Sequence, residues 1–450
     1  MNTILHNPSS AARRTRRTAK SRRGFASGLV LMMLVFLAGF VALGLNVSRL
    51  AQVQAQLRSV CQAAALAGAA ELIDEGFCGG VADQRDDVLM AREAARRTAE
   101  RNFVDGRMVV LNPNVDNAPL GDIVVGSIEP LKAAGQPMAL PFDVKHAQGL
   151  NTVRVTARMK MNTYNKVTLF CGALLGVLST DAAASAQATL DRRVAGFRPE
   201  PGVKVPCVPL AAEYESWMKQ ATAKCRPGVN DRYTVNYTTG EVTLGSDGVP
   251  EITLSTAARN NDAPSEDSAA TENSDPTNDN AANTDSETKP ADDASADVSA
   301  SNPPPAWCRP LALPSDEIKP DVWLSRCREG LGKHDLAMFG GQLIVLPQGS
   351  TPAQVLAAPP QDLIFGLQAI VGVSRAWALA EAGADDTSCA IVGFAAGRIV
   401  AVRRADDGSQ AAQSASWEII VQPTTLVSSQ AVTTAAMSPN PWIGKLELTQ

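Results

Sequence analysis

The sequence lacks the short motifs that usually carry catalysis or metal binding. It has three histidines in 450 residues, and none of its eight cysteines belongs to a Cys-x-x-Cys pair. Zinc and iron–sulfur sites need ligands at such spacings. The Gly-x-Ser-x-Gly, Walker and His-Glu-x-x-His motifs of hydrolases, nucleotide-binding proteins and metalloproteases are missing as well. We therefore predict no catalytic, cofactor-binding or metal-binding residues, and a protein that is not an enzyme.

A second absence is that of charge, because no charged side chain occurs between Arg23 and Arg49. Within this interval, Gly28–Leu45 contains eleven Leu, Val or Phe residues, which favour insertion into a bilayer by about 3 to 7 kcal/mol. As a helix the interval spans about 37 Å, enough to cross a hydrocarbon core of about 30 Å with some tilt. Residues 24–48 are therefore predicted to form a transmembrane helix.

The charges before this helix predict its orientation. Residues 1–23 carry seven Lys or Arg residues and no acid, although the net charge of the chain is -5. Cations stay on the cytoplasmic side, so we predict a basic cytoplasmic tail, a single pass through the cytoplasmic (inner) membrane and an extracytoplasmic bulk. The tail's position before an apolar run favours this topological role over nucleic-acid binding.

Three other roles of the apolar run remain open. It is also compatible with a cleaved secretory signal, with a twin-arginine export signal at Ser21–Phe25, and with a buried helix of a soluble core. The length of the run and the lack of a polar face favour the membrane anchor.

Beyond the membrane, apolar residues continue at helical spacing. They recur every three or four positions at Leu50, Val53, Leu57, Val60, Ala64 and Ala67. The stripe ends in the small-residue segment Ala63–Ala70. Residues 49–76 are predicted to form an exit helix, whose stripe packs either along a partner helix or on this protein's own globular body.

A known family shares the order of these elements. The shared features are Arg23-Gly24, the apolar run, Leu43–Val47, Gln56-Leu57 and Gln62–Ala69. In this order they resemble the N-terminal segment of TadE/TadG-like Flp pilus-assembly (tight adherence) proteins, over roughly residues 22–72. Two positions depart from the family pattern: Asn46 stands where an Asp is usual at the membrane exit, and Cys61-Gln62 replaces an acidic residue before the alanines.

The remainder is similar, more loosely, to the long TadG-like proteins of planctomycete-type bacteria. The similar segments are Asp122–Gly126, Val153–Ala157, Asp247–Ile252, Ile391–Phe394 and Arg398–Val400.

The family resemblance bears on processing of the N-terminus, because such proteins resemble minor pilins. A prepilin peptidase cuts after a Gly that precedes Phe, with Glu at the fifth mature position. Gly24-Phe25 offers the cleavage site, but Leu29 stands at the fifth position. We therefore predict no prepilin-type processing.

Residues 77–200 are predicted to form an α+β domain. An amphipathic helix is predicted at 82–103, with acids early and arginines late. Strands are predicted at Val109–Leu111, Ile123–Val125, Thr152–Met161 and Ser185–Leu190. Val167–Leu178 is apolar but too short to cross a membrane, so it is predicted to form a buried helix.

Two further strand-rich parts follow. Residues 201–256 contain a predicted hairpin, Tyr233–Leu244, that turns at Thr239-Gly240. Residues 306–450 are predicted to form a C-terminal α+β domain with a helix near Gln361–Ile370. Its strands are predicted at Gln342–Leu346, Cys389–Arg403 and Trp417–Val421. Gly393 and Gly397 lie within a strand pattern and indicate a bulge or close packing.

Residues 257–305 separate these two parts. From Asn260 to Pro305 there are eleven acids, one Lys and no aromatic residue. Such a segment cannot bury enough apolar surface to offset its ordering entropy, so a disordered acidic linker is predicted. A spacer, a calcium-attracting tract and a tolerated insertion remain alternative roles.

Export would permit disulfide bonds. Because short loops close easily, Cys207–Cys225 and Cys308–Cys327 are the pairs that we predict. Eight cysteines allow about 105 complete pairings, so the spacing does not determine connectivity.

These features predict an α+β protein whose single N-terminal transmembrane helix continues into an extracytoplasmic helix. The predicted function is non-catalytic, as a TadG-like minor component or accessory of Flp pilus assembly. The alternative is a membrane-tethered extracytoplasmic binding or scaffold protein unrelated to pili. The predicted partners are the lipid bilayer and other pilus-assembly or envelope proteins, with no cofactor and no nucleic acid.

Overall fold

The structure is a computed structural model. It describes residues 23–73, 84–129, 138–140, 149–160, 166–170, 172, 176–236, 239–257, 305–314, 321–347, 349–383, 387–405 and 416–449. The chain divides into two compact units. Unit 1 comprises residues 1–58, 103–107 and 157–184, and unit 2 comprises the rest. The predictions for the basic tail and for residues 258–304 lie outside the described residues.

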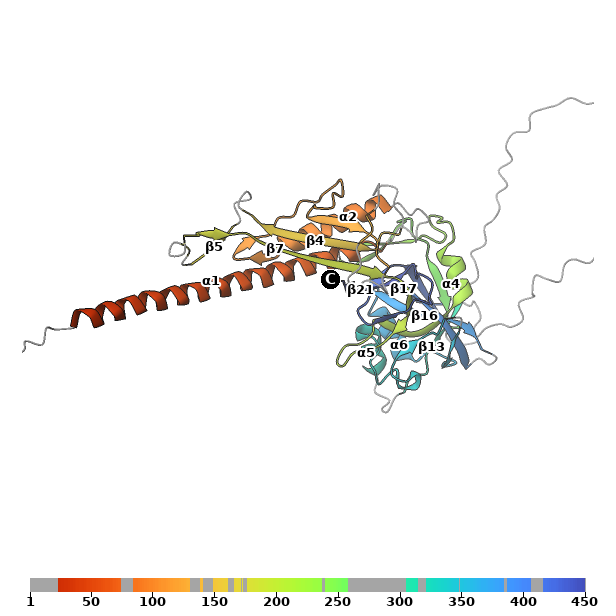
Figure 1. Ribbon diagram of the computed structural model, residues 1–450. Helices are drawn as coiled ribbons and strands as arrows, with labels where there is room; N and C mark the ends of the chain where they lie inside the picture. Colours follow the sequence, from red (N-terminus) through yellow and green to blue (C-terminus); the bar gives the residue numbers. More distant parts are fainter. Residues whose placement is uncertain are drawn as a thin grey trace, which may run out of the picture. The chain divides into compact units, whose positions relative to one another are not determined.

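The N-terminal part is one uninterrupted helix. α1 (Arg23–Ala70) has 48 residues, or about 72 Å, and joins the predicted transmembrane and exit helices (Figure 1). It is long and apolar enough to cross a membrane. Most side chains from Leu29 to Val47 are exposed, which for a stretch of Leu, Val, Met and Phe demands an apolar environment.

The second half of α1 is covered by the chain itself. Val53, Leu57, Val60 and Ala64 are buried, whereas Leu50 and Ala67 are half-buried. The predicted apolar stripe is therefore confirmed, and of its two possible partners the protein's own body is the one that receives it.

Small residues bring α1 and α2 (Gln84–Glu100) close together. A Cβ atom added to Gly68 would lie 2.9 Å from the carbonyl oxygen of Ala91 and 3.2 Å from the Cβ of Ala95. The buried face of α2 consists of Val88, Ala91, Ala95 and Ala99. Their spacing of three or four residues forms a narrow apolar stripe that admits the α1 backbone.

A five-stranded sheet joins early and late parts of the chain. Its order is β19 (Leu426–Val427), β21 (Ile443–Leu448), β7 (Ala182–Asp191), β4 (Thr152–Met159) and β3 (Ile123–Gly126). The hydroxyl of Thr189 lies 3.0 Å from that of Thr152 and 2.9 Å from that of Thr449. These buried hydroxyls satisfy one another across β4, β7 and the end of the chain.

Six strands close into a barrel within unit 2. In order around the ring they are β9 (Cys207–Glu213), β16 (Ser374–Ala382), β17 (Ser388–Arg404), β18 (Trp417–Pro423), β12 (Ile252–Ser255) and β13 (Ala306–Pro310). β17 closes the ring because its first half pairs with β16 and its second half pairs with β18. β15 (Thr351–Gln354) adds to the free edge of β17. Closure leaves few unpaired strand edges.

Strands on both sides of the acidic segment belong to this barrel. β12 precedes the segment, β13 follows it, and the two are parallel neighbours, with Leu254 opposite Ala306. Parallel neighbours need a crossover connection, so residues 256–305 supply the connection. Residues 201–256 and 306–450, which the sequence pattern separates, therefore contribute to one sheet.

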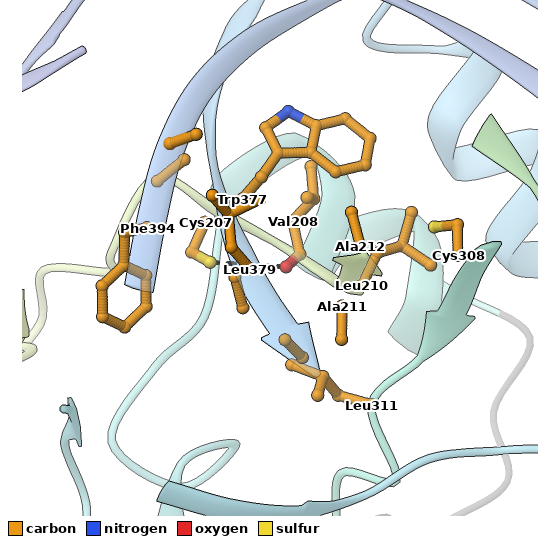
Figure 2. Packing of buried hydrophobic residues seen from close by; sticks show 14 of the residues in the cluster. Cys207, Val208, Leu210, Ala211, Ala212, Cys308, Leu311, Trp377, Leu379 and Phe394 are labelled. Carbon is orange, nitrogen blue, oxygen red and sulfur yellow. Dashed lines mark hydrogen bonds between the residues drawn. The ribbon is translucent and has the colours of Figure 1, made fainter. Parts of the chain in front are cut away.

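The barrel core is apolar and contains two buried tryptophans. Figure 2 shows side chains of β9, β13, β16 and β17 meeting there. The rings of Trp217 and Trp377 lie 5.6 Å apart, and Trp377 Nε1 donates a 3.2 Å hydrogen bond to the carbonyl of Gly397. A Cβ atom at Gly397 would lie 2.5 Å from Val421 Cγ1, which confirms close packing at this glycine. The strand register shifts opposite Gly393, which confirms a bulge there.

Short elements surround the barrel. α4 (Tyr214–Ala221) contacts β16, α5 (Asp321–Glu329) contacts β9, and α6 (Gln361–Gln368) contacts β17. A three-stranded sheet is ordered β14 (Leu343–Ile344), β8 (Val194–Phe197) and β20 (Ala431–Thr433). The predicted hairpin is confirmed as β10 (Tyr233–Val235) and β11 (Val242–Leu244), with a turn that reaches φ +73° at Gly240. A 3-10 turn at Ala337–Phe339 precedes β14.

Two local predictions are wrong. Val109–Leu111 forms no strand; the pairing lies earlier, between β1 (Phe103–Val104) and β2 (Arg107–Met108). The predicted helix Val167–Leu178 is wrong at its ends, because Val167–Thr168 (β5) pairs with Ser179–Thr180 (β6). Gly172 is helical, and residues 171 and 173–175 lie outside the described part of the chain.

The contact at Gly68 predicts a measurable cost of one methyl group. In Gly68→Ala the added Cβ overpacks against α2, which typically costs about 1–3 kcal/mol. Gly44→Ala is the matched control, because it lies in the same helix with nothing within 4 Å of its Cβ. Any gain in helix propensity is similar at both positions.

We expect Gly68→Ala to unfold at lower urea concentration than Gly44→Ala in detergent micelles, followed by tryptophan fluorescence. Equal stability of the two variants would show that α1 and α2 do not pack this closely.

Candidate functional site at the helix exit

Arg49 is the first charged residue after the apolar half of α1, and it is held on two sides. Its Nη2 donates to both carboxylate oxygens of Asp105, at 2.9 and 3.0 Å. Its guanidinium carbon lies 4.4 Å from the centre of the Phe170 ring. The side chains of Arg49 and Asp105 are only 20% and 17% exposed, so this ion pair is partly removed from water.

Asp105 is presented by a tight turn. Asp105 and Gly106 connect β1 to β2, and both have positive φ, 51° and 74°. This is the conformation of a type I′ hairpin turn, for which Asp-Gly is a preferred sequence. The backbone N–H of Asp105 also donates, at 3.1 Å, to Oε1 of Gln56, which lies about two turns after Arg49 on the same face of α1. We call Arg49, Gln56, Asp105 and Phe170 the exit clamp.

The exit clamp was not predicted. The helix predicted at 82–103 reaches into β1, whereas α2 already ends at Glu100. The signal was present, since Asp105-Gly106 is flanked by Phe103-Val104 and Arg107-Met108. Nothing in the sequence indicates that this turn faces Arg49, which lies 56 residues earlier.

The exit clamp can hold α1 where its apolar half ends. A hydrogen bond to a charged group contributes about 1.5–3 kcal/mol when shielded, and a cation–aromatic contact about 0.5–2 kcal/mol. The clamp also neutralises the cation nearest the apolar run. Its arrangement supports mechanical attachment, and its side chains contain no nucleophile.

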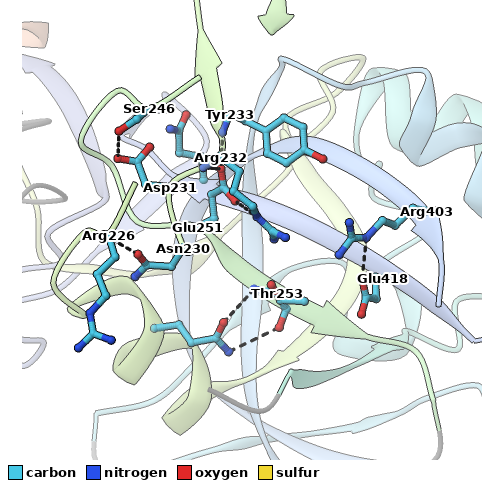
Figure 3. A network of polar contacts seen from close by, with 12 residues as sticks. Arg226, Asn230, Asp231, Arg232, Tyr233, Ser246, Glu251, Thr253, Arg403 and Glu418 are labelled. Carbon is cyan, nitrogen blue, oxygen red and sulfur yellow. Dashed lines mark hydrogen bonds and ion pairs between the residues drawn. The ribbon is translucent and has the colours of Figure 1, made fainter. Parts of the chain in front are cut away.

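In unit 2, the carboxylates of Asp231 and Glu251 accept hydrogen bonds from the backbone of neighbouring loops (Figure 3). The buried Asp231 accepts from Ser246 Oγ at 2.6 Å and from the backbone N–H groups of Asp247 and Gly248. Glu251 accepts from the backbone N–H groups of Arg232 and Tyr233, each at 2.6 Å. Within the described ranges no three His, Cys, Asp or Glu side chains form a group that could hold a metal ion.

The predicted disulfide bonds are wrong. Cys207, Cys225, Cys308 and Cys327 are all free thiols. Cys207 and Cys308 are buried on barrel strands, whereas Cys225 follows α4 and donates to the carbonyl of Gly248 at 2.9 Å. Short spacing in the sequence does not bring two Cβ atoms together when a helix or strand separates them.

Burial keeps these thiols protonated. It raises the pKa of Cys207 and of Cys308 to about 12. The pKa of Cys225 is raised to about 11, first by partial burial and then by the negative charges of Asp231, Asp247 and Glu251. Since the thiolate is the reactive form, these cysteines are poor nucleophiles near neutral pH.

An apolar, exposed helix half followed by a half buried in the chain's own body is the arrangement of a membrane-anchored protein. The family described as "Putative Flp pilus-assembly TadE/G-like" matches residues 24–71. This range coincides with α1 and confirms the resemblance drawn from the sequence. The N-terminal segment is thus TadE/G-like and indicates a role related to Flp pilus assembly.

No curated protein and no solved structure matches the chain. The family match ends at residue 71, so the looser likeness to planctomycete-type TadG-like proteins stays a prediction.

The exit clamp predicts protection of the peptide bond after Arg49 from trypsin. Asp105→Asn keeps a residue that tolerates positive φ but removes the charge that pairs with Arg49. Losing about 1 kcal/mol of local stability makes opening about fivefold more frequent. Cleavage after Arg49 should accelerate by a similar factor, as measured by mass spectrometry of limited digests in detergent.

Glu241→Gln is the control, because it removes the same charge from an exposed position in unit 2. If Asp105→Asn and Glu241→Gln are cleaved after Arg49 at equal rates, the ion pair does not hold the helix.

The pKa of Cys225 predicts slow alkylation of this half-buried thiol. With a pKa of about 11 instead of 9.0, its thiolate fraction near pH 8 is about a hundredfold smaller. The iodoacetamide rate at Cys225 should rise about tenfold per pH unit and level off only near pH 11. In urea the same residue should level off near the ordinary value; a plateau below about pH 9 in the folded protein contradicts the prediction.

Proposed function

We propose that this protein is a non-catalytic, single-pass protein of the cytoplasmic (inner) membrane. It acts as a TadG-like minor component or accessory in the assembly of Flp-type (tight adherence) pili. The observation that carries the proposal is the match of residues 24–71 to TadE/G-like proteins, which coincides with α1.

The shape of the matched segment supports an anchoring role. A single helix carries an exposed apolar half and a half that the protein's own body covers. Both halves belong to one uninterrupted helix. Attachment of this kind suits a protein that links an assembling filament to the envelope.

The charge distribution supports a cytoplasmic N-terminus. Seven cations precede the apolar run, and Arg49 is the first to follow it. Because Arg49 is paired with Asp105, the positive charge immediately beyond the run is neutralised. The difference in charge between the two ends therefore favours the N-terminus as the cytoplasmic one.

The non-catalytic assignment draws on how the polar groups are used. Asp231 and Glu251 accept hydrogen bonds from neighbouring backbone N–H groups, and burial keeps Cys207 and Cys308 protonated. These groups stabilise loops and strands. The proposed partners are accordingly the bilayer and other pilus-assembly or envelope proteins.

A second candidate is a membrane-tethered extracytoplasmic binding or scaffold protein unrelated to pili. It is favoured by the six-stranded barrel, which lies wholly outside the matched residues. In that case the TadE/G-like helix serves only as a tether.

Deletion of the gene in its own host distinguishes the two. Under the pilus proposal, cells should lose sheared Flp-type pili and recover them with the full chain. A variant in which residues 24–48 are replaced by an unrelated apolar helix of equal length tests whether tethering alone suffices.

Membrane fractionation serves as the control for each strain. Unchanged pilus numbers after deletion, with the protein present in the membrane fraction of the parent, would support the scaffold function and exclude the pilus role.

A further inference from the structure

Three apolar side chains next to the paired strands β5 and β6 are exposed. Phe170, Val177 and Leu178 are 73%, 50% and 69% exposed. Backbone hydrogen bonds hold this segment: Leu169 N–H donates to the carbonyl of Leu178 at 3.0 Å, and Val177 N–H to that of Gly172 at 3.0 Å. A fixed apolar surface of this kind usually meets a partner or a membrane.

Strands β5 and β6 lie at the end of the apolar half of α1, within unit 1. The Phe170 ring lies 4.4 Å from the Arg49 guanidinium. Arg49 follows Val47, the last exposed residue of the apolar run, by two positions, or about 3 Å along the helix. Phe170 is therefore at the depth where a bilayer that α1 crosses meets water, and aromatic rings favour this depth.

Burial within the apolar run supports the same placement. Ala42 and Asn46 are 3% and 5% exposed, whereas Leu43, Leu45 and Val47 are about half exposed. The protein thus covers one face of α1 up to seven residues, or about 10 Å, before Arg49. Part of unit 1 must lie beside the helix at the level of the apolar run.

The charge of this part suits a bacterial lipid surface. Residues 157–184 contain three cations, Arg158, Lys160 and Lys166, and one acid, Asp181. The chain as a whole has a net charge of -5, so this segment departs from the rest. Cations in such a segment attract anionic lipid headgroups.

We propose that Phe170, Val177 and Leu178, which lie next to the paired strands β5 and β6, insert into the outer interface of the bilayer that α1 crosses. The protein then has two adjacent membrane contacts, a spanning helix and an interfacial segment. Two contacts resist tilting of α1 better than one. The proposal rests on α1 as a membrane anchor, which is part of the proposed function.

The test uses the full chain in vesicles of phosphatidylethanolamine and phosphatidylglycerol that contain a lipid with a diazirine on its acyl chain. After irradiation, labelled peptides are mapped by mass spectrometry. We expect label in the peptides of α1 between Gly28 and Val47 and in the peptide that contains Val177 and Leu178. The joint variant Val177→Asp, Leu178→Asp should lose the label in its own peptide and keep the α1 label.

Leu244 provides the matched control, because it is 81% exposed on β11, between a threonine and a glycine. Its peptide should stay unlabelled, and Leu244→Asp should leave labelling of the Val177–Leu178 peptide unchanged. Label in α1 without label in that peptide overturns the proposal and leaves the anchor intact; the three apolar residues then serve a protein partner. Absence of label from both peptides contradicts the anchor itself, and equal label in the Leu244 and Val177–Leu178 peptides also overturns the proposal.

Discussion

Arg49 follows the apolar half of α1. Its ion pair with Asp105 compensates the charge at the point where the helix leaves its apolar surroundings. Arg49 donates to Asp105 and lies over the ring of Phe170, so its charge is compensated by groups within 5 Å of the guanidinium. An unpaired arginine at this position would need water or lipid headgroups around it. With the pair in place, the helix continues from the exposed apolar residues to the buried ones without a break. The rest of unit 1 is held to α1 through these side chains as well as through the backbone.

The sheets of unit 2 depend on pairing between strands that are distant in the sequence. β21, near the C-terminus, pairs with β7, and β12 and β13 meet across the acidic segment. The barrel closes because β17 is long enough, at 17 residues, to pair with β16 along one half and with β18 along the other. The acidic segment thereby connects two neighbouring strands of one barrel, and its length is not constrained by the pairing.

The family match and the barrel occupy different parts of the protein. The TadE/G-like similarity covers α1, whereas the barrel and its surrounding helices lie outside the matched residues. Within unit 2, carboxylates such as Asp231 and Glu251 are engaged in ordering loops, and buried thiols such as Cys308 remain protonated.

Local features were predictable from the sequence, because each is decided by residues close together in the chain. The helix Arg23–Ala70, its apolar stripe at Val53 and Leu57, and the turn at Gly240 all follow from spacing and turn chemistry. The bulge at Gly393 and the close packing at Gly397 also followed from glycines placed within a strand. The ends of Val167–Leu178 were mispredicted as helical because apolar content alone does not distinguish a buried helix from strands whose neighbours are exposed.

The tertiary structure alone decided which distant residues meet. Asp105 reaches Arg49 across 56 positions, and Cys207 and Cys225 stay free although they are close in the sequence, because β9 and α4 separate them. These outcomes depend on strand pairing and on the direction of each Cβ atom, which local spacing does not encode. The sequence by itself determined that a long apolar helix with a TadE/G-like pattern begins the protein. Folding decided that the charge at the end of its apolar half is paired with Asp105 and that Phe170 lies beside it.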